Sequence, residues 1–588
     1  MQPLTGGDAV VGTLGALGVE VVFGIPSVHN LPIYDSLRRY GAIRAVTVRH
    51  EQAAAGAADA YARVTGRVGV FITSTGPGAA NAMGAQLEAY VSSSPVVHIT
   101  GQIESRHLDR HRGFIHEVPD QPAMLGSLSK WTGRAGSPEE IPPRLADALI
   151  YASTHPQGPT SLEIPIDIQY ANYPGPERRS WSWGADAAGV RVGRRKAWPG
   201  PIGRGLETRA VVLGVPPAGV DEAAQQRAIE LLRSARRPLI WAGGGVVAAH
   251  AWEELATLAR LLGAGVITSA NGRGVIDETD PLCIGNLPWD KGVRALCQRA
   301  DLLLAVGTRF QGPNTENWKM PLPETLVHID VDPAVLGRSY TPTVALVDDA
   351  RHALGAILDA LEQDPPPDRD ASWPNDVAAT TDAARRHLRD TLGPQVGLLD
   401  GLEAVLDRDT VVVKDATIPA YTWGNRLLPV RRPGVSVMPN GFAIGLGMTH
   451  ALGAAAADPS KPVVLMVGDG GFMLAATELA TMAAERLPVV VVLFNDGGYG
   501  ILRNIQDRQY EARIGVDLGR PDFCKLATAL GAGAQCVGTI DDYKLALEQA
   551  FRRAADERLP QLVEVDLEGI GPMATPFIGT SRPPSAGK

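Results

Sequence analysis

The chain has 588 residues, which is too long for one hydrophobic core and enough for about three or four domains of ordinary size. Its apolar content of 45% and its charged content of 20% are typical of a soluble globular enzyme. The net charge of −9, with no long basic run, gives no reason to expect nucleic acid as a partner and argues against anionic membranes. We therefore expect small-molecule chemistry.

The four cysteines lack the CxxC or Cys/His spacing of a zinc site or a disulfide framework, so we expect them to be reduced. The N-terminal segment lacks the basic and long apolar regions of a signal peptide, and no segment is apolar over the roughly 20 residues of a membrane span. These features predict a cytoplasmic protein.

Residues 1–173 alternate apolar strands with helix-like runs, which predicts a first α/β domain. The strands expected there are residues 19–23, 45–48, 68–72, 96–99 and 161–164. Residues 174–215 are rich in Gly, Pro, Arg and Trp and have little periodicity, so we interpret them as a linker or an insertion.

Two further α/β units follow this segment. The strands expected in a central domain at 216–362 are residues 238–242, 265–268, 302–306 and 325–329. A proline-containing break marks a second linker at 363–394. The strands expected in a domain at 395–570 are residues 410–413, 463–467, 489–494 and 561–565, and a tail at 571–588 follows them.

Residues 461–500 carry the most informative pattern, a strand, a tight loop, a helix and a second strand. The first strand ends in Gly468-Asp469-Gly470-Gly471 and the second in Asn495-Asp496-Gly497-Gly498. Both strands are unbroken apolar runs, as expected in a covered parallel sheet. Asp469 and Asp496 are therefore expected at the carboxyl edge of one sheet, where open α/β folds bind ligands.

The residue types fit a cation bound to phosphate. Mg²⁺ prefers oxygen ligands, which Asp469, Asp496 and a backbone carbonyl near Gly498 can supply, with a diphosphate and water completing the shell. Gly470 and Gly471 let backbone N–H groups approach phosphate oxygens. Taken alone, Asp469 would be a helix N-cap and Asp496 a turn residue.

This pattern resembles the thiamine diphosphate motif, in which GDG, a helix and an Asn/Asp pair after an apolar strand occur at the spacing seen here. The usual second metal ligand of that motif is Asn. Asp496 at that position adds a negative charge but keeps an oxygen ligand. The resemblance implies thiamine diphosphate and Mg²⁺ as cofactors.

Glu51 follows an expected strand and precedes a helix predicted over 53–64. It resembles the activating glutamate of thiamine diphosphate enzymes, whose carboxylic acid binds ring N1′ and favours the tautomer that removes the thiazolium C2 proton. Taken alone, Glu51 would be a first-turn residue stabilised by the helix dipole.

Further motifs occur in the order found in the acetolactate synthase-like family, and the resemblance spans nearly the whole chain. These motifs are FGIP at 23–26, STGPGAAN at 74–81, TGQ at 100–102, KDAT at 414–417 and NGFAIGLG at 440–447. The resemblance implies an α/β fold of three doubly wound parallel-sheet domains, two of them thiamine diphosphate-binding folds on either side of a central Rossmann-like domain.

The same resemblance implies cofactor-binding positions and an assembly. The positions are Gly76, Asn81, Asp415, Thr417, Phe442 and Ile444, with Ile444 as the apolar wedge that holds the cofactor bent. The implied assembly is a homodimer or homotetramer with active sites at the subunit interface, where Glu51 of one subunit faces Asp469 of another.

The central domain carries weaker signals. Gly243-Gly244-Gly245 follows a strand and loosely matches a dinucleotide-binding loop, and Gly307-Thr308-Arg309-Phe310 resembles the end of the FAD-binding strand of flavin-containing relatives. Residues 285–292 lack the glycine- and histidine-rich loop expected beside FAD. A flavin-free domain is therefore favoured over an FAD site.

Two departures distinguish the chain from a branched-chain acetolactate synthase. Ile505 replaces the tryptophan of the QWQ motif, and His29 and His116 replace small or amide residues. The patterns FGIP-x-VH and HE-x-PDQ, the second ending in Gln121, resemble decarboxylases of guanidino and other longer 2-oxo acids. A single histidine would be structural, but two at the mouth of a pocket favour proton transfer.

We predict thiamine diphosphate- and Mg²⁺-dependent decarboxylation of a small 2-oxo acid, with the enamine protonated to an aldehyde or passed to an acceptor. Glu51, His29, His116 and Gln121 are the candidate catalytic residues. The alternative is an acetolactate synthase-type carboligase, with or without FAD. A non-catalytic cofactor-binding scaffold is the third interpretation.

Overall fold

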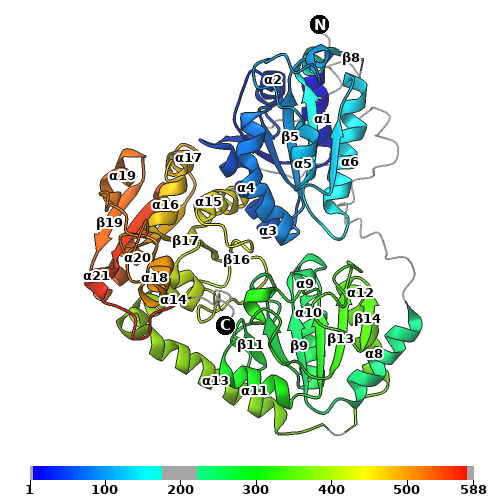
Figure 1. The fold of residues 1–588 in the computed structure, drawn as a ribbon, viewed down its shortest axis with the longest axis vertical. Coiled ribbons are helices and arrows are strands. Elements are labelled where there is room, and N and C mark those ends of the chain that lie inside the picture. The colour runs from blue at the N-terminus through cyan, green and yellow to red at the C-terminus, as the bar shows by residue number, and fades with distance from the viewer. Residues whose placement is uncertain (1–3, 175–220, 368, 579–588) are drawn as a thin grey trace. The chain divides into compact units, whose positions relative to one another are not determined.

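The computed structural model describes residues 4–174, 221–367 and 369–578 (Figure 1). The predicted linker or insertion at 174–215 lies outside the described residues except for its first position. The predicted tail lies outside them from residue 579 onward.

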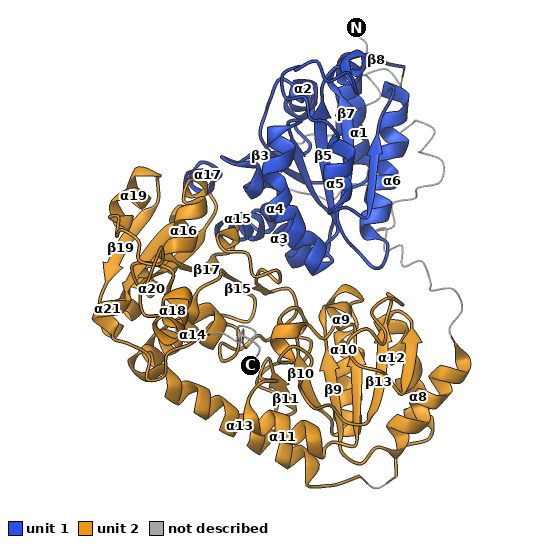
Figure 2. Cartoon of the chain, in the orientation of Figure 1, with its two compact units in different colours: residues 1–214, 448–458, 480–485 blue, residues 215–447, 459–479, 486–588 orange. Residues whose placement is uncertain are grey.

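The chain divides into two compact units (Figure 2). Unit 1 consists of residues 1–214, 448–458 and 480–485, and unit 2 consists of residues 215–447, 459–479 and 486–588. The three main sheets are each six-stranded, one in unit 1 and two in unit 2. Three parallel-sheet α/β folds were predicted, and this class is confirmed, while the exact domain boundaries stay a prediction.

The sheet of unit 1 has the order β3-β2-β4-β5-β7-β6, with every pair parallel. Its strands are β2 Val21–Gly24, β3 Arg44–Thr47, β4 Gly69–Thr73, β5 Val96–Gln102, β6 Trp131–Arg134 and β7 Thr160–Pro165. Its helices are α1 Gly6–Ala16, α2 Leu31–Tyr40, α3 Glu51–Thr65, α4 Pro77–Ser92, α5 Gln121–Gly126, α6 Ile141–Ser153 and α7 Ile166–Tyr170. A two-stranded antiparallel ribbon joins β1 Leu4–Thr5 to β8 Asn172–Tyr173.

Helix α3, which carries Glu51, is held against α15 (Leu446–Ala457) by close backbone packing within unit 1. A Cβ on Gly56 would lie 2.1 Å from Thr449 Oγ1, and one on Gly453 would lie 2.0 Å from the Ala57 carbonyl oxygen. The fully buried Asp59 Oδ2 lies 3.0 Å from His450 Nε2 in the same contact. Any larger side chain at the two glycines would force these helices apart.

The first sheet of unit 2 has the order β11-β10-β9-β12-β13-β14, again all parallel. Its strands are β9 Pro238–Ala242, β10 Gly265–Thr268, β11 Cys283–Gly285, β12 Leu302–Val306, β13 Thr325–Asp330 and β14 Val344–Val347. The helices around it are α8 Glu222–Ser234, α9 Gly244–Ala248, α10 Trp252–Leu262, α11 Lys291–Arg299, α12 Ala350–Gln363 and α13 Trp373–Leu392. A Cβ on Gly243 would lie 1.9 Å from the Gly307 carbonyl oxygen. These glycines therefore allow the loop after β9 to touch the loop after β12.

The second sheet of unit 2 has the order β16-β15-β17-β18-β20-β19 and is also parallel. Its strands are β15 Val411–Lys414, β16 Ser436–Val437, β17 Val463–Gly468, β18 Val489–Asn495, β19 Gly533–Val537 and β20 Gln561–Asp566. The helices that follow α13 are α14 Val396–Val405, α16 Asp469–Ala475, α17 Glu478–Ala484, α18 Gly500–Gln509, α19 Phe523–Ala529, α20 Ile540–Glu557 and α21 Leu567–Ile570.

The strands β17 and β18 supply the centre of this core. All residues from Val489 to Asn495 are buried, and each fully buried valine or leucine stabilises the fold by about 1.5–3 kcal/mol. From β15 the chain continues to β16 on one side of the sheet, whereas from β17 it continues to β18 on the other side. The direction in which the sheet is wound therefore reverses between β15 and β17. The carboxyl ends of β15 and β17 therefore border the crevice in which such folds bind ligands.

Within the described ranges, no helix is long and apolar enough to cross a membrane.

Candidate functional site

Asp469 and Asp496 come together at the carboxyl edge of the second sheet of unit 2. Asp469 begins α16 directly after β17, and Asp496 follows β18, with Gly468 opposite Phe494 in the parallel ladder. Asp469 is only 3% exposed, and its Oδ1 atom is buried with no hydrogen-bond partner in the described part of the chain. An unpaired carboxylate oxygen at this depth is unfavourable unless a ligand satisfies it.

The electrostatics of the pair fit a divalent cation. Burial, and then the charge of Asp496, raise the pKa of Asp469 to about 6. Burial also raises the pKa of Asp496, and the charge of Arg503 offsets part of that rise. A bound Mg²⁺ would relieve the repulsion between the two carboxylates.

The protein groups alone do not complete a metal shell. Over the described residues there is no group of three or more His, Cys, Asp and Glu side chains that could hold a metal ion. A cation at Asp469 and Asp496 would therefore take further oxygens from a backbone carbonyl, water and a diphosphate, which is the arrangement that Mg²⁺ favours at phosphate sites.

The glycines beside Asp469 keep the backbone accessible. A Cβ on Gly470 would lie 2.6 Å from the Tyr499 ring, and one on Gly471 would lie 3.1 Å from Asp415 Oδ2. Both glycines line a cavity of about 930 Å³ within unit 2. That volume suits a small organic molecule or cofactor.

Asp415 shapes one wall of this cavity without lining it. Its carboxylate is fully buried and accepts hydrogen bonds from the backbone N–H groups of Gly445 (3.0 Å to Oδ1) and Gly447 (3.1 Å to Oδ2), and from Ala416. Gly445 has a φ of 86°, a conformation that favours glycine. The carboxylate thereby fixes the backbone from Gly445 to Gly447.

The loop held by Asp415 presents two apolar side chains to the cavity. Phe442 is 44% exposed and Ile444 is 36% exposed, and both line it. Thr417 lines it from the loop after β15, where a Cβ on Gly468 would lie 3.1 Å from Thr417 Oγ1. The remaining predicted residues of unit 2 that line the same cavity are Asp469, Gly470, Gly471, Asp496 and Gly498.

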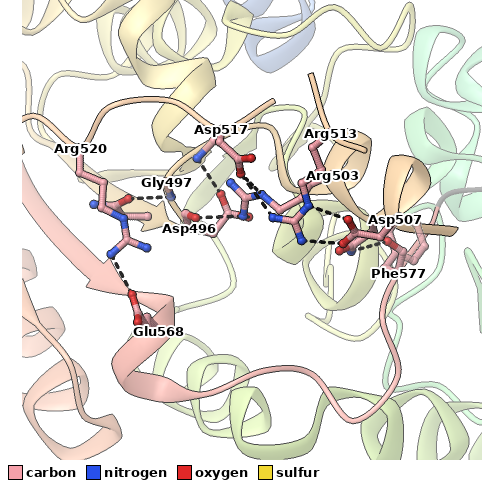
Figure 3. A network of polar contacts seen from close by, with 12 residues as sticks. Asp496, Gly497, Arg503, Asp507, Arg513, Asp517, Arg520, Glu568 and Phe577 are labelled. Carbon is pink, nitrogen blue, oxygen red and sulfur yellow. Dashed lines mark hydrogen bonds and ion pairs between the residues drawn. The ribbon is translucent and has the colours of Figure 1, made fainter. Parts of the chain in front are cut away.

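A network of charged side chains surrounds the Asp496 loop (Figure 3). Arg503 on α18 donates through Nη1 to the Asp496 carbonyl oxygen at 3.0 Å and through Nε to Asp517 Oδ1 at 2.8 Å. Arg520 donates to Glu568 Oε2 at 3.1 Å, and its charge also offsets part of the rise in the pKa of Asp496. Sequence reasoning missed both arginines. Asp496 stands where Asn is usual, and its extra negative charge was a sequence signal that a cationic side chain would be needed nearby.

Glu51 is the first residue of α3, so the helix begins two residues before the predicted start. His50 is the N-cap, and its Nδ1 accepts from Gln52 N at 3.1 Å. Asn81 on α4 donates through Nδ2 to Glu51 Oε2 at 3.0 Å. A Cβ on Gly78 would lie 3.2 Å from Glu51 Oε1, so the glycine-rich turn leaves room for this carboxylate.

Gly76 and Gln121 form the neighbouring turn. Gly76 has a φ of 58°, and a Cβ there would lie 2.5 Å from the His116 carbonyl oxygen. Gln121 is 1% exposed, and its Oε1 accepts from Gly76 N at 2.9 Å and from Thr75 Oγ1 at 2.8 Å. Its Nε2 donates to Glu163 Oε2 at 2.9 Å. These contacts are those of a residue that positions the turn, and its predicted catalytic role stays a prediction.

His29 and His116 lie side by side in unit 1. Their ring centroids are 5.1 Å apart, and Ser74 Oγ lies 3.4 Å from the Nδ1 atom of each ring. His29 is 2% exposed, and burial, followed by the charge of His116, lowers its pKa below the ordinary value of 6.5. Ser74 belongs to a motif that the sequence analysis quoted, but its position between the histidines depends on tertiary structure.

The candidate residues thus form two groups. Those of unit 1 are Glu51, Asn81, Gly76, Gln121, His29 and His116. Those of unit 2 are Asp415, Thr417, Phe442, Ile444, Asp469, Gly470, Gly471, Asp496 and Gly498. The first group offers a carboxylate and paired imidazoles for proton transfer, and the second offers oxygen ligands and a cavity.

Three family models of thiamine pyrophosphate enzyme domains match the chain. The N-terminal TPP binding domain matches residues 4–124, the central domain matches residues 225–357 and the C-terminal TPP binding domain matches residues 419–565.

Relatives of similar length carry two kinds of name. A probable 2-ketoarginine decarboxylase AruI of Pseudomonas aeruginosa is 36% identical over 562 residues, covering 94% of this chain and 93% of that protein. A probable acetolactate synthase large subunit of Methanocaldococcus jannaschii is 30% identical, covering 93% and 90%. The acetolactate synthase large subunit of Corynebacterium glutamicum is 31% identical, covering 93% and 85%.

Matches to all three domain models, and relatives that align over nearly the entire chain, show that this protein belongs to the thiamine pyrophosphate enzyme family.

Proposed function

We propose that the chain is a thiamine diphosphate- and Mg²⁺-dependent enzyme that decarboxylates a small 2-oxo acid and releases an aldehyde or passes the product to an acceptor. When bound, thiamine diphosphate supplies a nucleophilic carbon that adds to the 2-oxo group and takes up the electron pair left by CO₂. Membership of the thiamine pyrophosphate enzyme family supports this reaction class.

The proposed cofactor site uses residues of both groups. Asp469, Asp496 and the Gly498 carbonyl would hold Mg²⁺, and the unpartnered Oδ1 of Asp469 supports this role. Gly470 and Gly471 would face the diphosphate, and the loop fixed by Asp415 would orient Ile444 and Phe442 against the rings. Thr417 and Gly76 would border the same cofactor.

Glu51 would hold and move the proton that activates the cofactor. The 3.0 Å hydrogen bond from Asn81 Nδ2 restrains its carboxylate, which favours one orientation toward a ring nitrogen. Glu51 lies in unit 1 and Asp469 in unit 2. On the resemblance to the acetolactate synthase-like family, we propose a homodimer or homotetramer in which Glu51 of one subunit and Asp469 of another complete each site.

Mixing two inactive variants tests this assembly. Glu51→Gln and Asp469→Ala each destroy a different half of the site, so mixed oligomers of the two variants should regain part of the wild-type activity. Each variant alone should remain inactive. Mass spectrometry shows whether mixed oligomers form. If they form but regain no activity, the sites are not shared between subunits.

The observation that favours decarboxylation is the His29–His116 pair. Two imidazoles whose ring centroids lie 5.1 Å apart, with Ser74 between them, can pass a proton to the product, which favours release of an aldehyde over attack on a second carbonyl. The name of the Pseudomonas aeruginosa relative points in the same direction. A guanidino 2-oxo acid is therefore one substrate to include in an assay.

Product analysis tests this preference. We expect His29→Asn and His116→Asn to slow aldehyde release more than CO₂ loss. The control is His352→Asn, which should change neither rate, because the His352 side chain is 60% accessible on the surface. If both variants keep the wild-type ratio of aldehyde to CO₂, the two histidines are structural.

The second candidate is an acetolactate synthase-type carboligase, which the names of two relatives favour. Such an enzyme would form 2-hydroxy-3-oxo acids and could carry FAD. We propose a flavin-free protein, because residues 285–292 depart from the loop expected beside FAD. A yellow preparation with stoichiometric FAD would favour the carboligase, and a protein that releases no CO₂ would be a scaffold.

A further inference from the structure

Arg426 lines the 930 Å³ cavity, together with Asn286 and Trp289 of the segment that follows β11. Its guanidinium carbon is 3.1 Å from the centroid of the Trp289 ring and 5.5 Å from that of Phe577. Stacking on an indole face suits a guanidinium and holds its plane in one orientation. The arginine is thus fixed in place while it lines the cavity.

No counter-charge for this cation is found in the part of the chain that the structure describes. Nη1 of Arg426 is buried without a hydrogen-bond partner. Burial lowers the pKa of Arg426 well below its ordinary value, and no neighbouring carboxylate opposes that effect. Because a guanidinium keeps its proton in proteins, the unfavourable burial is not relieved by neutralisation.

Two amides that line the same cavity, those of Asn286 and Asn425, also have unsatisfied atoms. Oδ1 of Asn286 and Oδ1 of Asn425 are buried with no hydrogen-bond partner among the described residues, and Asn286 Nδ2 donates to the Asn425 carbonyl oxygen at 3.3 Å. Rotation of the Asn425 amide would present its NH₂ group instead of its oxygen. One cation and adaptable amides together make a polar recess without a protein partner.

This recess differs in charge from the Asp469–Asp496 pair. Asp469 and Asp496 bring two carboxylates to the cavity, which suit a cation, whereas Arg426 brings a cation, which suits an anion. The fork of N–H donors on a guanidinium matches the two oxygens of a carboxylate or phosphate. A guanidino side chain, by contrast, would be repelled there.

We propose that Arg426, together with Asn286 and Asn425, forms a binding site for an oxyanion of a small molecule, either a carboxylate or a phosphate, separate from the cofactor diphosphate. The site goes beyond the decarboxylation proposed above and does not depend on it. Its ligand supplies the counter-charge that the described residues lack.

Calorimetric titration of the holoenzyme tests the site. The protein is saturated with thiamine diphosphate and Mg²⁺ so that the diphosphate position is filled, and succinate and inorganic phosphate are then titrated separately. We expect at least one of them to bind at one site per chain, and the stronger binder identifies the oxyanion class. Failure of both anions to bind the wild-type holoenzyme would overturn the proposal.

Substitutions locate the binding. Arg426→Met should weaken it by about tenfold or more, because a charge-assisted hydrogen bond and the counter-charge are both lost. Arg426→Lys keeps the charge and should retain part of the affinity. The exposed Arg552→Met removes one positive charge elsewhere and should leave binding unchanged. Wild-type affinity in Arg426→Met would contradict the site.

A crystal structure of the wild-type holoenzyme with the stronger anion provides a measurement that needs no variant. We expect the anion within hydrogen-bond distance of Arg426 Nη1. An anion found only at other positions would refute the proposal even if Arg426→Met failed to fold.

Discussion

Replacing Asp415 by asparagine should loosen the loop that faces the cofactor. The carboxylate accepts from the backbone N–H groups of Ala416, Gly445 and Gly447, with Gly445 bonding to both oxygens and Gly447 to Oδ2. Asparagine keeps one oxygen for Ala416 and Gly445. Its NH₂ group then faces the N–H of Gly447, so two donors oppose each other in a fully buried position.

The size of the effect follows from that lost bond. A hydrogen bond to a charged acceptor contributes about 1.5–3 kcal/mol, and an unsatisfied buried donor adds to the loss. We therefore expect a loss of about 2 kcal/mol, which corresponds to roughly a thirtyfold change in an equilibrium constant. The loss can fall on global stability or on the free energy of ordering the loop when the cofactor binds.

Two measurements separate these possibilities. Urea denaturation of the protein without cofactor reports the free energy of unfolding, and calorimetric titration with thiamine diphosphate and Mg²⁺ reports the dissociation constant. The exposed Asp556→Asn provides a control that changes the same group without these contacts. If Asp415→Asn leaves both the unfolding free energy and the dissociation constant unchanged, Asp415 does not hold the loop.

Other substitutions and a pH series test the rest of the site. Glu51→Gln should lower kcat by about 10² to 10⁴, the contribution of a positioned acid–base group, while thiamine diphosphate still binds in calorimetry. Asp469→Ala should abolish Mg²⁺-dependent cofactor binding in the same assay, whereas Asp496→Asn should be tolerated because it keeps an oxygen ligand. Burial lowers the pKa of His98 from 6.5 to about 3, so the unfolded chain binds a proton below 6.5 that the folded chain does not. The free energy of unfolding should therefore fall by about 2 kcal/mol between about pH 6.5 and about pH 5, and this loss should be absent in His98→Gln.

Each of these predictions has a contrary result. Near wild-type turnover in Glu51→Gln would remove its assigned role. Loss of cofactor in Asp496→Asn together with retention in Asp469→Ala would refute the ligand assignment. An unfolding free energy with the same pH dependence in wild type and His98→Gln would show that His98 is protonated in the folded protein.

The central strands could be predicted from the sequence because they are buried on both faces. Residues 238–242 and 302–306 were expected as strands and are β9 and β12. The strands without a counterpart in the prediction lie at sheet edges, such as β6, which is only half-buried along its length, and β19, which has one exposed and three half-buried residues. An edge strand has a neighbour on one side only and needs fewer apolar residues.

The residues of the candidate site also divide into those that a local motif reveals and those that only the tertiary structure reveals. Residues such as Asp469 and Glu51 lie next to strand ends, so a local motif was sufficient to find them. The roles of Ser74, Arg503 and Arg426 depend on groups brought together from distant parts of a unit. Gln121 was selected from a motif, but only the structure reveals that its amide is occupied by the turn at Gly76.

Release of CO₂ from 2-oxo acids, measured with and without thiamine diphosphate and Mg²⁺, tests the central claim most directly. The panel includes pyruvate, branched-chain 2-oxo acids and 2-ketoarginine, and aldehyde is quantified in the same samples. We predict CO₂ release from at least one substrate that requires both cofactors and yields aldehyde in step with CO₂. Absence of cofactor-dependent CO₂ release from every member of the panel would contradict the account.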